Sequence, residues 1–233
     1  MRTWLKVVLA IAGVAVAGLV VLFLSYDEDL PRGEVGLEAE ALADRLLAAV
    51  DKPAWDTTAF VAWDFAGRQR YRWRRDVDTV EVRWGGVRVD LHTETVTGVA
   101  YRDGERVLGD DADELVREAW AHFCNDSFWL AAPFKVRDPG TTREAVPLPL
   151  GGDGEGGTGL LVRYASGGVT PGDAYLWELG DDGRPVAYRM WTSIIPVGGV
   201  RATWADWTRL PSGAWVAERH AIGPVDLVVD VEE

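Results

Sequence analysis

Histidine and cysteine, the side chains that most often bind metals or act as nucleophiles, are scarce in this chain. The sequence has three histidines, His92, His122 and His220, and one cysteine, Cys124. No two histidines have the short helical spacing of a zinc site. The tripeptide that begins at His92 matches the first half of a zinc deaminase signature, but the second half requires two cysteines. We therefore expect no metal and no cofactor, and we interpret Cys124 as a small buried hydrophobe.

Motifs for nucleophilic or dinucleotide chemistry are also missing. A serine nucleophile elbow has the form Gly-x-Ser-x-Gly, and no serine here has those neighbours. Ser166 precedes two glycines and is typical of a turn. Gly154, Gly156 and Gly159 formally match a dinucleotide fingerprint, but they lead into a predicted strand rather than a helix. We expect a protein that is not an enzyme.

Polar residues do gather in one stretch of the chain. Asp126 and Ser127 are followed by Lys135 and Asp138. Side chains of these types near the end of a helix usually bond to backbone groups that lack a helical partner, so we favour a structural role for them. A hydrolase that used Asp126, Asp138 or His220 is a further hypothesis, and it requires these residues to meet in one cleft.

Net charge argues against nucleic acid as a partner. The chain has 233 residues, a formal charge of -13 and a pI near 4.7, whereas a phosphate-binding surface is basic. The run Arg70–Arg75 alternates arginine with Tyr71 and Trp73, as stacking surfaces for single strands do. We interpret it instead as a strand that buries its aromatic residues and exposes its arginines.

An apolar run of 18 residues, Val7–Leu24, follows the basic residues Arg2 and Lys6. As a helix it covers about 27 Å, which is enough to span the hydrocarbon core of a bilayer. Acidic residues occupy positions 27–29, and this order of charges favours an N-terminus inside and a domain outside. Cleavage near Ala17 is the alternative, but it would leave an apolar stub, so we favour an uncleaved anchor.

The chain therefore divides into a transmembrane signal anchor, residues 1–30, and one exported domain, residues 31–233. Its single cysteine cannot form an internal disulfide, and no cysteine near the apolar run offers a site for a lipid. The bias toward Ala, Gly, Arg and Val is typical of bacteria. We expect a single-pass protein of the bacterial inner membrane, with its N-terminus in the cytoplasm and its domain in the periplasm or outside the cell.

Helical patterns occur twice in the exported domain. Apolar residues at i, i+4 and i+8 predict a helix over 38–50, which Pro53 ends. A second helix is predicted to begin at Asp111, where Glu114 completes a capping box. We expect this helix to break between 125 and 134, where aromatic and polar residues are mixed and a proline follows.

Strand patterns fill the rest of the domain. From 57 to 107, apolar and polar residues alternate between short turns that contain glycine, which predicts a meander of antiparallel strands. Further strands are predicted at 142–148, 160–165, 173–179, 185–192, 200–210 and 214–222. Because a sheet of roughly nine to eleven twisted strands must curl, we predict an α+β fold, a curled antiparallel sheet with a helical lid.

This order of elements resembles the periplasmic lipoprotein-carrier superfamily, of the LolA, LolB and LppX type. The local motifs NDSFWL at 125–130, PFK at 133–135, DPG at 138–140 and GVTPGD at 168–173 resemble uncharacterised bacterial envelope proteins of that fold. The resemblance implies a half-open barrel with a helical lid. It also implies a ligand, because the carriers bind lipids or acyl chains in an apolar hollow.

We therefore expect the domain to bind an apolar ligand, such as a lipid or the acyl chain of a lipoprotein. The alternative is a membrane-tethered interaction or sensor module whose hollow is filled by its own side chains. Mobility of the lid at 128–133 would control entry of the ligand. The candidate contacts are aromatic residues on the predicted strands and lid: Trp63, Tyr71, Trp73, Trp84, Phe128, Trp129, Phe134, Trp177 and Trp191.

Overall fold

The computed structural model describes residues 27–149, 157–166 and 172–232. The α-helices are α2 (Leu37–Ala49), α3 (Lys52–Asp56) and α4 (Asp110–Ala131), and the 3-10 helices are η1 (Arg75–Val77) and η2 (Ala132–Lys135). The first strands are β1 (Phe60–Phe65), β2 (Gln69–Arg74), β3 (Thr79–Trp84), β4 (Val87–His92), β5 (Thr97–Arg102), β6 (Glu105–Arg106) and β7 (Thr141–Pro147). The remaining strands are β8 (Thr158–Tyr164), β9 (Ala174–Leu179), β10 (Pro185–Trp191), β11 (Val200–Thr203), β12 (Ala205–Arg209), β13 (Trp215–Ile222) and β14 (Val225–Val231).

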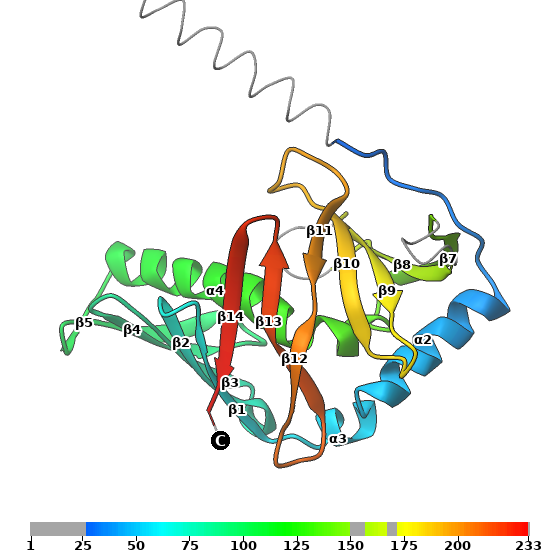
Figure 1. Ribbon diagram of the computed structural model, residues 1–233. Coiled ribbons are helices and arrows are strands. Elements are labelled where there is room, and N and C mark those ends of the chain that lie inside the picture. Colours follow the sequence, from blue (N-terminus) through cyan, green and yellow to red (C-terminus); the bar gives the residue numbers. More distant parts are fainter. Residues whose placement is uncertain (1–26, 150–156, 167–171, 233) are drawn as a thin grey trace, which may run out of the picture.

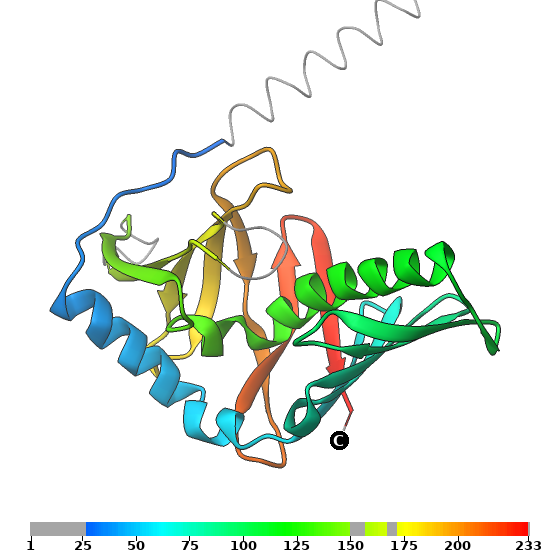
Figure 2. The same ribbon diagram turned by 180° about the vertical axis from the view of Figure 1, so that it is seen from behind.

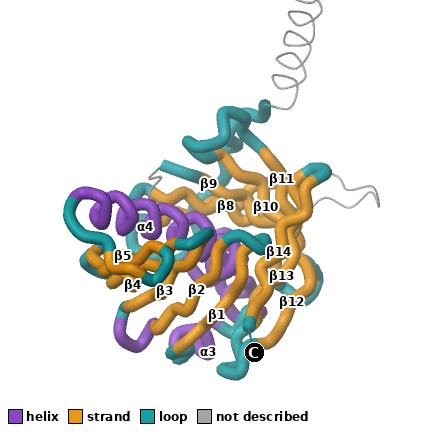
Figure 3. Tube along the Cα trace, turned by 90° about the vertical axis from the view of Figure 1, so that its left-hand side faces the viewer, coloured by secondary structure: helices purple, strands orange, loops and turns teal. Residues whose placement is uncertain are grey.

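All of these strands belong to one antiparallel sheet, in the order β6-β5-β4-β3-β2-β1-β14-β13-β11-β10-β9-β8-β7, with β12 paired to β13. The last strand joins the two halves of the chain, because β14 pairs with β1 on one side and β13 on the other. β6 and β7 form the two edges, so the sheet is curled but not closed (Figure 3). The predicted α+β fold with a curled antiparallel sheet is confirmed.

The helices lie on the inner side of the sheet. α4 crosses this side, from the β4–β5 region toward β13, and α2 packs against β7 and β8 (Figures 1 and 2). On α4 the stripe Leu115, Ala119, Phe123 and Leu130 is buried, as its helical spacing predicts. The main core lies between this stripe and the inward-facing residues of the strands.

The predicted break in the second helix is wrong, because α4 is continuous from 110 to 131. Its polar residues obtain partners from side chains instead of from an unwound backbone. The Tyr71 hydroxyl donates to Asp126 Oδ2 at 2.5 Å, and Asn125 Nδ2 donates to Asp126 Oδ1 at 2.8 Å. The helix tightens into η2 only where Pro133, which has no backbone N–H, enters. The predicted lid at 128–133 is thus largely buried; within it only Phe128 is partly exposed.

Both predicted helix ends need correction. The N-cap of α4 is Gly109 and makes no side-chain cap bond, so the predicted capping box is absent; three aspartates in the first turn favour the helix dipole instead. The first helix ends at Ala49, and Pro53 lies in the first turn of the short helix α3 rather than marking a stop.

Two predictions about strands also need correction. The predicted strand 200–210 is divided at Trp204, whose N–H donates to Val186 O at 2.8 Å, so it forms β11 and β12. The final strand β14 was not predicted, whereas the short edge strand β6 falls at the end of the predicted meander, 57–107. With them the sheet has 14 strands, more than expected.

The predicted transmembrane anchor, residues 1–30, falls mainly outside the described residues, which begin at Asp27. Among the residues from 27 onward that the structure describes, no helix is both long and apolar enough to cross a membrane. The anchor stays a prediction.

Candidate functional site

A cavity of about 760 Å³ lies between the C-terminal half of α4 and the strands β8 to β10. α4 contributes Trp120, Phe123, Cys124, Phe128 and Trp129 to its wall. The sheet contributes apolar and aromatic residues: Trp73, Tyr164, Tyr175, Tyr188, Met190 and Ile222. A hollow of this size and lining is typical of a small-molecule site.

Polar lining residues come from strand ends that meet at one side of the cavity. Tyr164 ends β8, Asp173 precedes β9 and Thr192 follows β10, and the register brings these strand ends together. Lys135 and Asp138 complete this side with an ion pair of 2.9 Å. The hydroxyl oxygens of Tyr164 and Thr192 are buried without a hydrogen-bond partner in the described structure. Both oxygens are covered by protein atoms, so a polar group of a ligand would reach them only after a neighbouring side chain moves.

The cavity opens to the surface through a rim of exposed residues, Asn125, Pro139, Ser166 and Ile194, which we call the mouth. Ile194 is the most apolar of these and is 64% exposed. The mouth thus lies on the polar side of the cavity, while Trp73 and Phe123 contact each other on the aromatic side. This arrangement suits a molecule with an apolar body and a polar end.

A buried polar pair lies beside the cavity wall. Asp126 is 3% exposed and its carboxylate accepts from Tyr71 and Asn125. Burial raises the pKa of Asp126 despite these hydrogen bonds, and burial together with the adjacent carboxylate raises the pKa of Tyr71. Burial likewise raises the pKa of Cys124 to about 12, so its thiol is protonated at neutral pH and is a poor nucleophile.

Of the nine predicted contact residues, Trp73, Phe128 and Trp129 line the cavity. Six others lie elsewhere, most of them because the core uses them. Trp63 and Tyr71 stack on each other at 4.5 Å between ring centroids and are fully buried. The other core members are Phe134, which stacks on Trp55 at 4.3 Å, and Trp177, which packs against Tyr188 and Trp204.

The remaining two predicted residues lie outside the core. Trp84 is half-buried and contacts His122 on α4 at 5.3 Å between ring centroids. Trp191 belongs to a small cluster of apolar residues separate from the main core, and its indole N–H donates to Glu28 O at 2.7 Å. Neither side chain lines the cavity.

The sequence did not lead us to predict most of the residues that form the cavity wall. Tyr175 is two residues from Trp177 on β9, and Tyr188 and Met190 share a face of β10, so strand alternation alone would have placed them on the inner side. Trp120 on α4 is three residues from Phe123, which helical spacing would have indicated. No local signal separates these residues from ordinary core.

The hydrolase hypothesis finds no support in the geometry. Asp126 bonds to Tyr71, Asp138 pairs with Lys135, and His220 packs against Trp129 and Trp204. Within the described ranges, no group of three histidine, cysteine or carboxylate side chains could hold a metal.

A second hollow, about 640 Å³, lies on the outer face of β2 to β5. Its charged residues are paired, for example Glu81 with Arg83 at 2.7 Å and Asp90 with Arg88 at 3.5 Å. Arg72 also covers the exposed ring of Phe60. The inner cavity is therefore the better candidate for an apolar ligand.

No protein-family model matches the sequence, and no curated protein matches it either. Two solved structures are similar in chain path. A DUF1329 family protein from Desulfovibrio piger is 10% identical with a TM-score of 0.41, over 84% of this chain and 91% of the other. A domain from Vibrio parahaemolyticus, described as an outer membrane lipoprotein-sorting protein, is 10% identical with a TM-score of 0.38, over 82% and 92% of the two chains.

Proposed function

We propose that this protein binds a single amphiphile, such as a lipid or the acyl chain of a lipoprotein, in the cavity beneath α4. The observation that carries the proposal is the aromatic cavity of about 760 Å³ that remains inside a well-filled core and opens at a polar mouth. The apolar body of the ligand would contact Phe123, Trp129 and Met190. Its polar end would lie near Lys135 and Tyr164.

Burial of an acyl chain supplies enough free energy for this role without any catalyst. Each buried methylene contributes about 0.8 kcal/mol, so a chain of ordinary length gains on the order of 10 kcal/mol if the cavity encloses it. The cost of ordering the ligand reduces this gain. The walls themselves are stiff aromatic rings on strands and on a continuous helix, so little ordering of the protein is required.

We also propose that the domain is tethered to a membrane. The apolar run Val7–Leu24 would hold the domain at the outer side of a bacterial inner membrane, with the N-terminus in the cytoplasm. In that setting the domain would receive or present a lipid next to the bilayer rather than carry it freely between membranes.

A cavity-filling substitution tests the binding site directly. Cys124 is half-buried on α4 and lines the cavity, so Cys124→Phe would place a ring where the ligand body lies. Cys124→Ala is the matched control, because it removes the sulfur without filling the space. We would export residues 27–233 of each form to a bacterial periplasm, confirm cooperative unfolding, and measure co-purifying lipid by native mass spectrometry.

The proposal predicts a stoichiometric lipid in the native and Cys124→Ala domains and its loss from Cys124→Phe. The native and Cys124→Ala domains should also take up a fluorescent fatty-acyl probe, and Cys124→Phe should not. If all three folded domains are free of lipid and take up no probe, the binding proposal fails and a module that binds other proteins becomes the better hypothesis.

A further inference from the structure

The first described residues are fixed to the loop between β10 and β11. Glu28 N–H donates to Gly198 O at 3.1 Å, and Gly198 N–H donates to Asp27 Oδ1 at 2.7 Å. The Glu28 carboxylate pairs with Arg189 at 2.6 Å, and its backbone oxygen accepts from Trp191. Two consecutive residues thus use backbone and side chains to contact one short segment.

Contacts continue along the linker toward α2. Pro31 O accepts from Arg163, and Gly33 N–H donates to Glu144 at 2.8 Å. Glu34 forms a two-hydrogen-bond bridge with Ala145 on β7. The chain from 27 to 34 therefore behaves as part of the domain, whereas a free linker would leave the orientation of the domain undefined.

The loop that holds Asp27 and Glu28 also forms one wall of the mouth. Thr192, Ile194 and Ile195 from this loop line the cavity. The segment 192–199 has no charged residue, and Ile194 exposes 64% of its surface. An uncharged loop with an exposed isoleucine suits contact with the interfacial region of a lipid bilayer.

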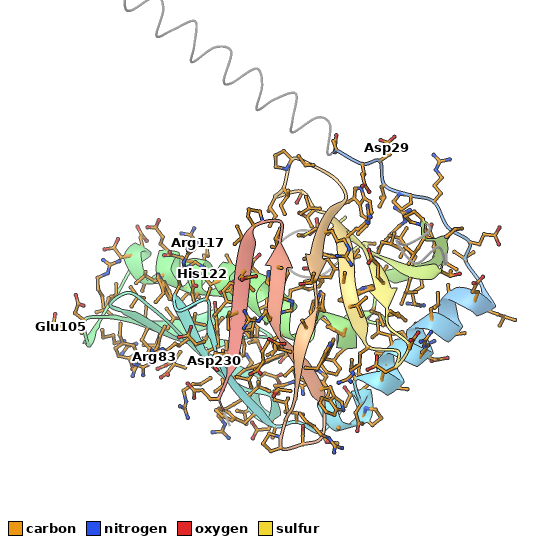
Figure 4. The ribbon with its side chains drawn as sticks, in the orientation of Figure 1. Asp29, Arg83, Glu105, Arg117, His122 and Asp230 are labelled. Atoms are coloured by element: carbon orange, nitrogen blue, oxygen red, sulfur yellow. The ribbon has the colours of Figure 1, made fainter. Side chains whose placement is uncertain are left out.

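Chain length places this loop near the end of the apolar run. Leu24 is the last residue of that run, and three residue steps separate it from Asp27. Even a fully extended chain spans no more than about 11 Å over three steps. Asp29 lies at the same end of the molecule as the loop, while Glu105 lies at the far end (Figure 4).

We infer that the mouth faces the membrane in which the run Val7–Leu24 is anchored, with Ile194 in contact with lipid. A ligand then passes between the bilayer and the cavity without crossing open water. This inference rests on the proposed function and on the anchor, and it adds the orientation of the domain and the route of entry.

The orientation is measurable on the full chain. We would reconstitute it in phosphatidylcholine vesicles and attach a fluorophore to Ile194→Cys, in a Cys124→Ala background. The matched control is Leu108→Cys in the same background, because Leu108 is 71% exposed and follows β6 at the far end. Lipids with a nitroxide on the headgroup or upper acyl chain then report contact by quenching.

We expect strong quenching at position 194 and none at position 108. The inference is overturned if position 194 is not quenched, if both positions are quenched equally, or if position 108 alone is quenched. It is also overturned if the chain washes off the vesicles. The lipid-binding test on residues 27–233 does not depend on orientation. Loss of quenching with retained lipid therefore refutes only the inference, whereas quenching without bound lipid refutes the proposed function and the route of entry but supports the orientation.

Discussion

His220 is a fully buried titratable group that packs against Trp129 in the cavity wall. Its ring is 0% exposed, lies 4.5 Å from Trp204 between ring centroids, and has Nδ1 at 3.1 Å from Thr203 O. Burial lowers the pKa of His220 from 6.5 to about 4, against the opposing effect of nearby backbone oxygens. The imidazole is therefore neutral in the folded protein at physiological pH.

The lowered pKa of His220 predicts that the folded protein loses stability in acid. Between pH 6.5 and 4 the unfolded chain binds a proton at His220 that the folded chain does not, so stability is complete above pH 6.5 and falls as the pH decreases through this window. The loss at pH 4 is at most about 3 kcal/mol from this residue. Urea unfolding at pH 7 and pH 5 measures the free energy of unfolding of the native chain and of His220→Gln. The native chain should lose more stability than the variant between the two pH values. An equal loss in both proteins would contradict the assignment.

A second prediction follows from the hydrogen bond between Tyr71 and Asp126. Tyr71→Phe removes the donor from a buried carboxylate, which should cost about 1–3 kcal/mol of unfolding free energy at pH 7. Without this bond the pKa of Asp126 rises further, so the cost should diminish as the pH falls and the carboxyl group becomes protonated. Adding Asp126→Asn to Tyr71→Phe should recover part of the stability at pH 7. Urea titrations of the three proteins measure both effects, and equal stability of Tyr71→Phe and the native chain would refute them.

Elements with strict alternation were predictable, because a strand with one face on the core must bury every second residue. Val61, Trp63 and Phe65 on β1 are all buried, as their spacing predicts, although the small residue Ala62 on the other face is buried as well. The failures arose where a distant partner decided the outcome. Asp126 stays helical because Tyr71, 55 residues away, bonds to it, and β14 depends on pairing with β1 at the other end of the domain. No local pattern contains such information.

The edge strand β7 depends on the linker for protection. Gly33 lies so close to it that a Cβ at this position would be 2.5 Å from Ala145 O, which is backbone and cannot move aside. Gly33→Ala should therefore displace the bridge at Glu34 and expose the β7 edge. Hydrogen exchange at the Ala145 amide should become faster. Gly157→Ala is the control, because its Cβ would meet nothing closer than 3.9 Å, and similar exchange in the two variants would refute the prediction.

The whole molecule explains why the site was only partly predictable. A chain with twelve tryptophans and a curled sheet must place aromatic residues both in the core and around any cavity, and the same alternation serves both. Trp73 reached the cavity and Trp63, on the neighbouring strand, did not. The deciding factor is the path of α4 across the sheet, which fixes where side chains fill the interior and where space remains.

Overall charge should select among amphiphiles of equal chain length. The protein carries a formal charge of -13, and the polar side of the cavity has one cation, Lys135, with two carboxylates, Asp138 and Asp173. An anionic head near the mouth meets a like charge, whereas a zwitterionic head does not. We therefore expect lysophosphatidylcholine to bind more tightly than lysophosphatidylglycerol with the same acyl chain, by about tenfold at low salt.

Two changes should reduce this difference in affinity between the zwitterionic and the anionic lipid. High salt screens the field of the exposed charges, and Asp138→Asn leaves Lys135 free to attract the anionic head. Asp206→Asn is the matched control, because Asp206 pairs with Arg219 on the exposed surface and is not part of the cavity lining. Competition with a fluorescent acyl probe measures each affinity. Tighter binding of the anionic lipid to the native chain would show that contacts with Lys135 outweigh the acidic field, and the head group would then be assigned as anionic.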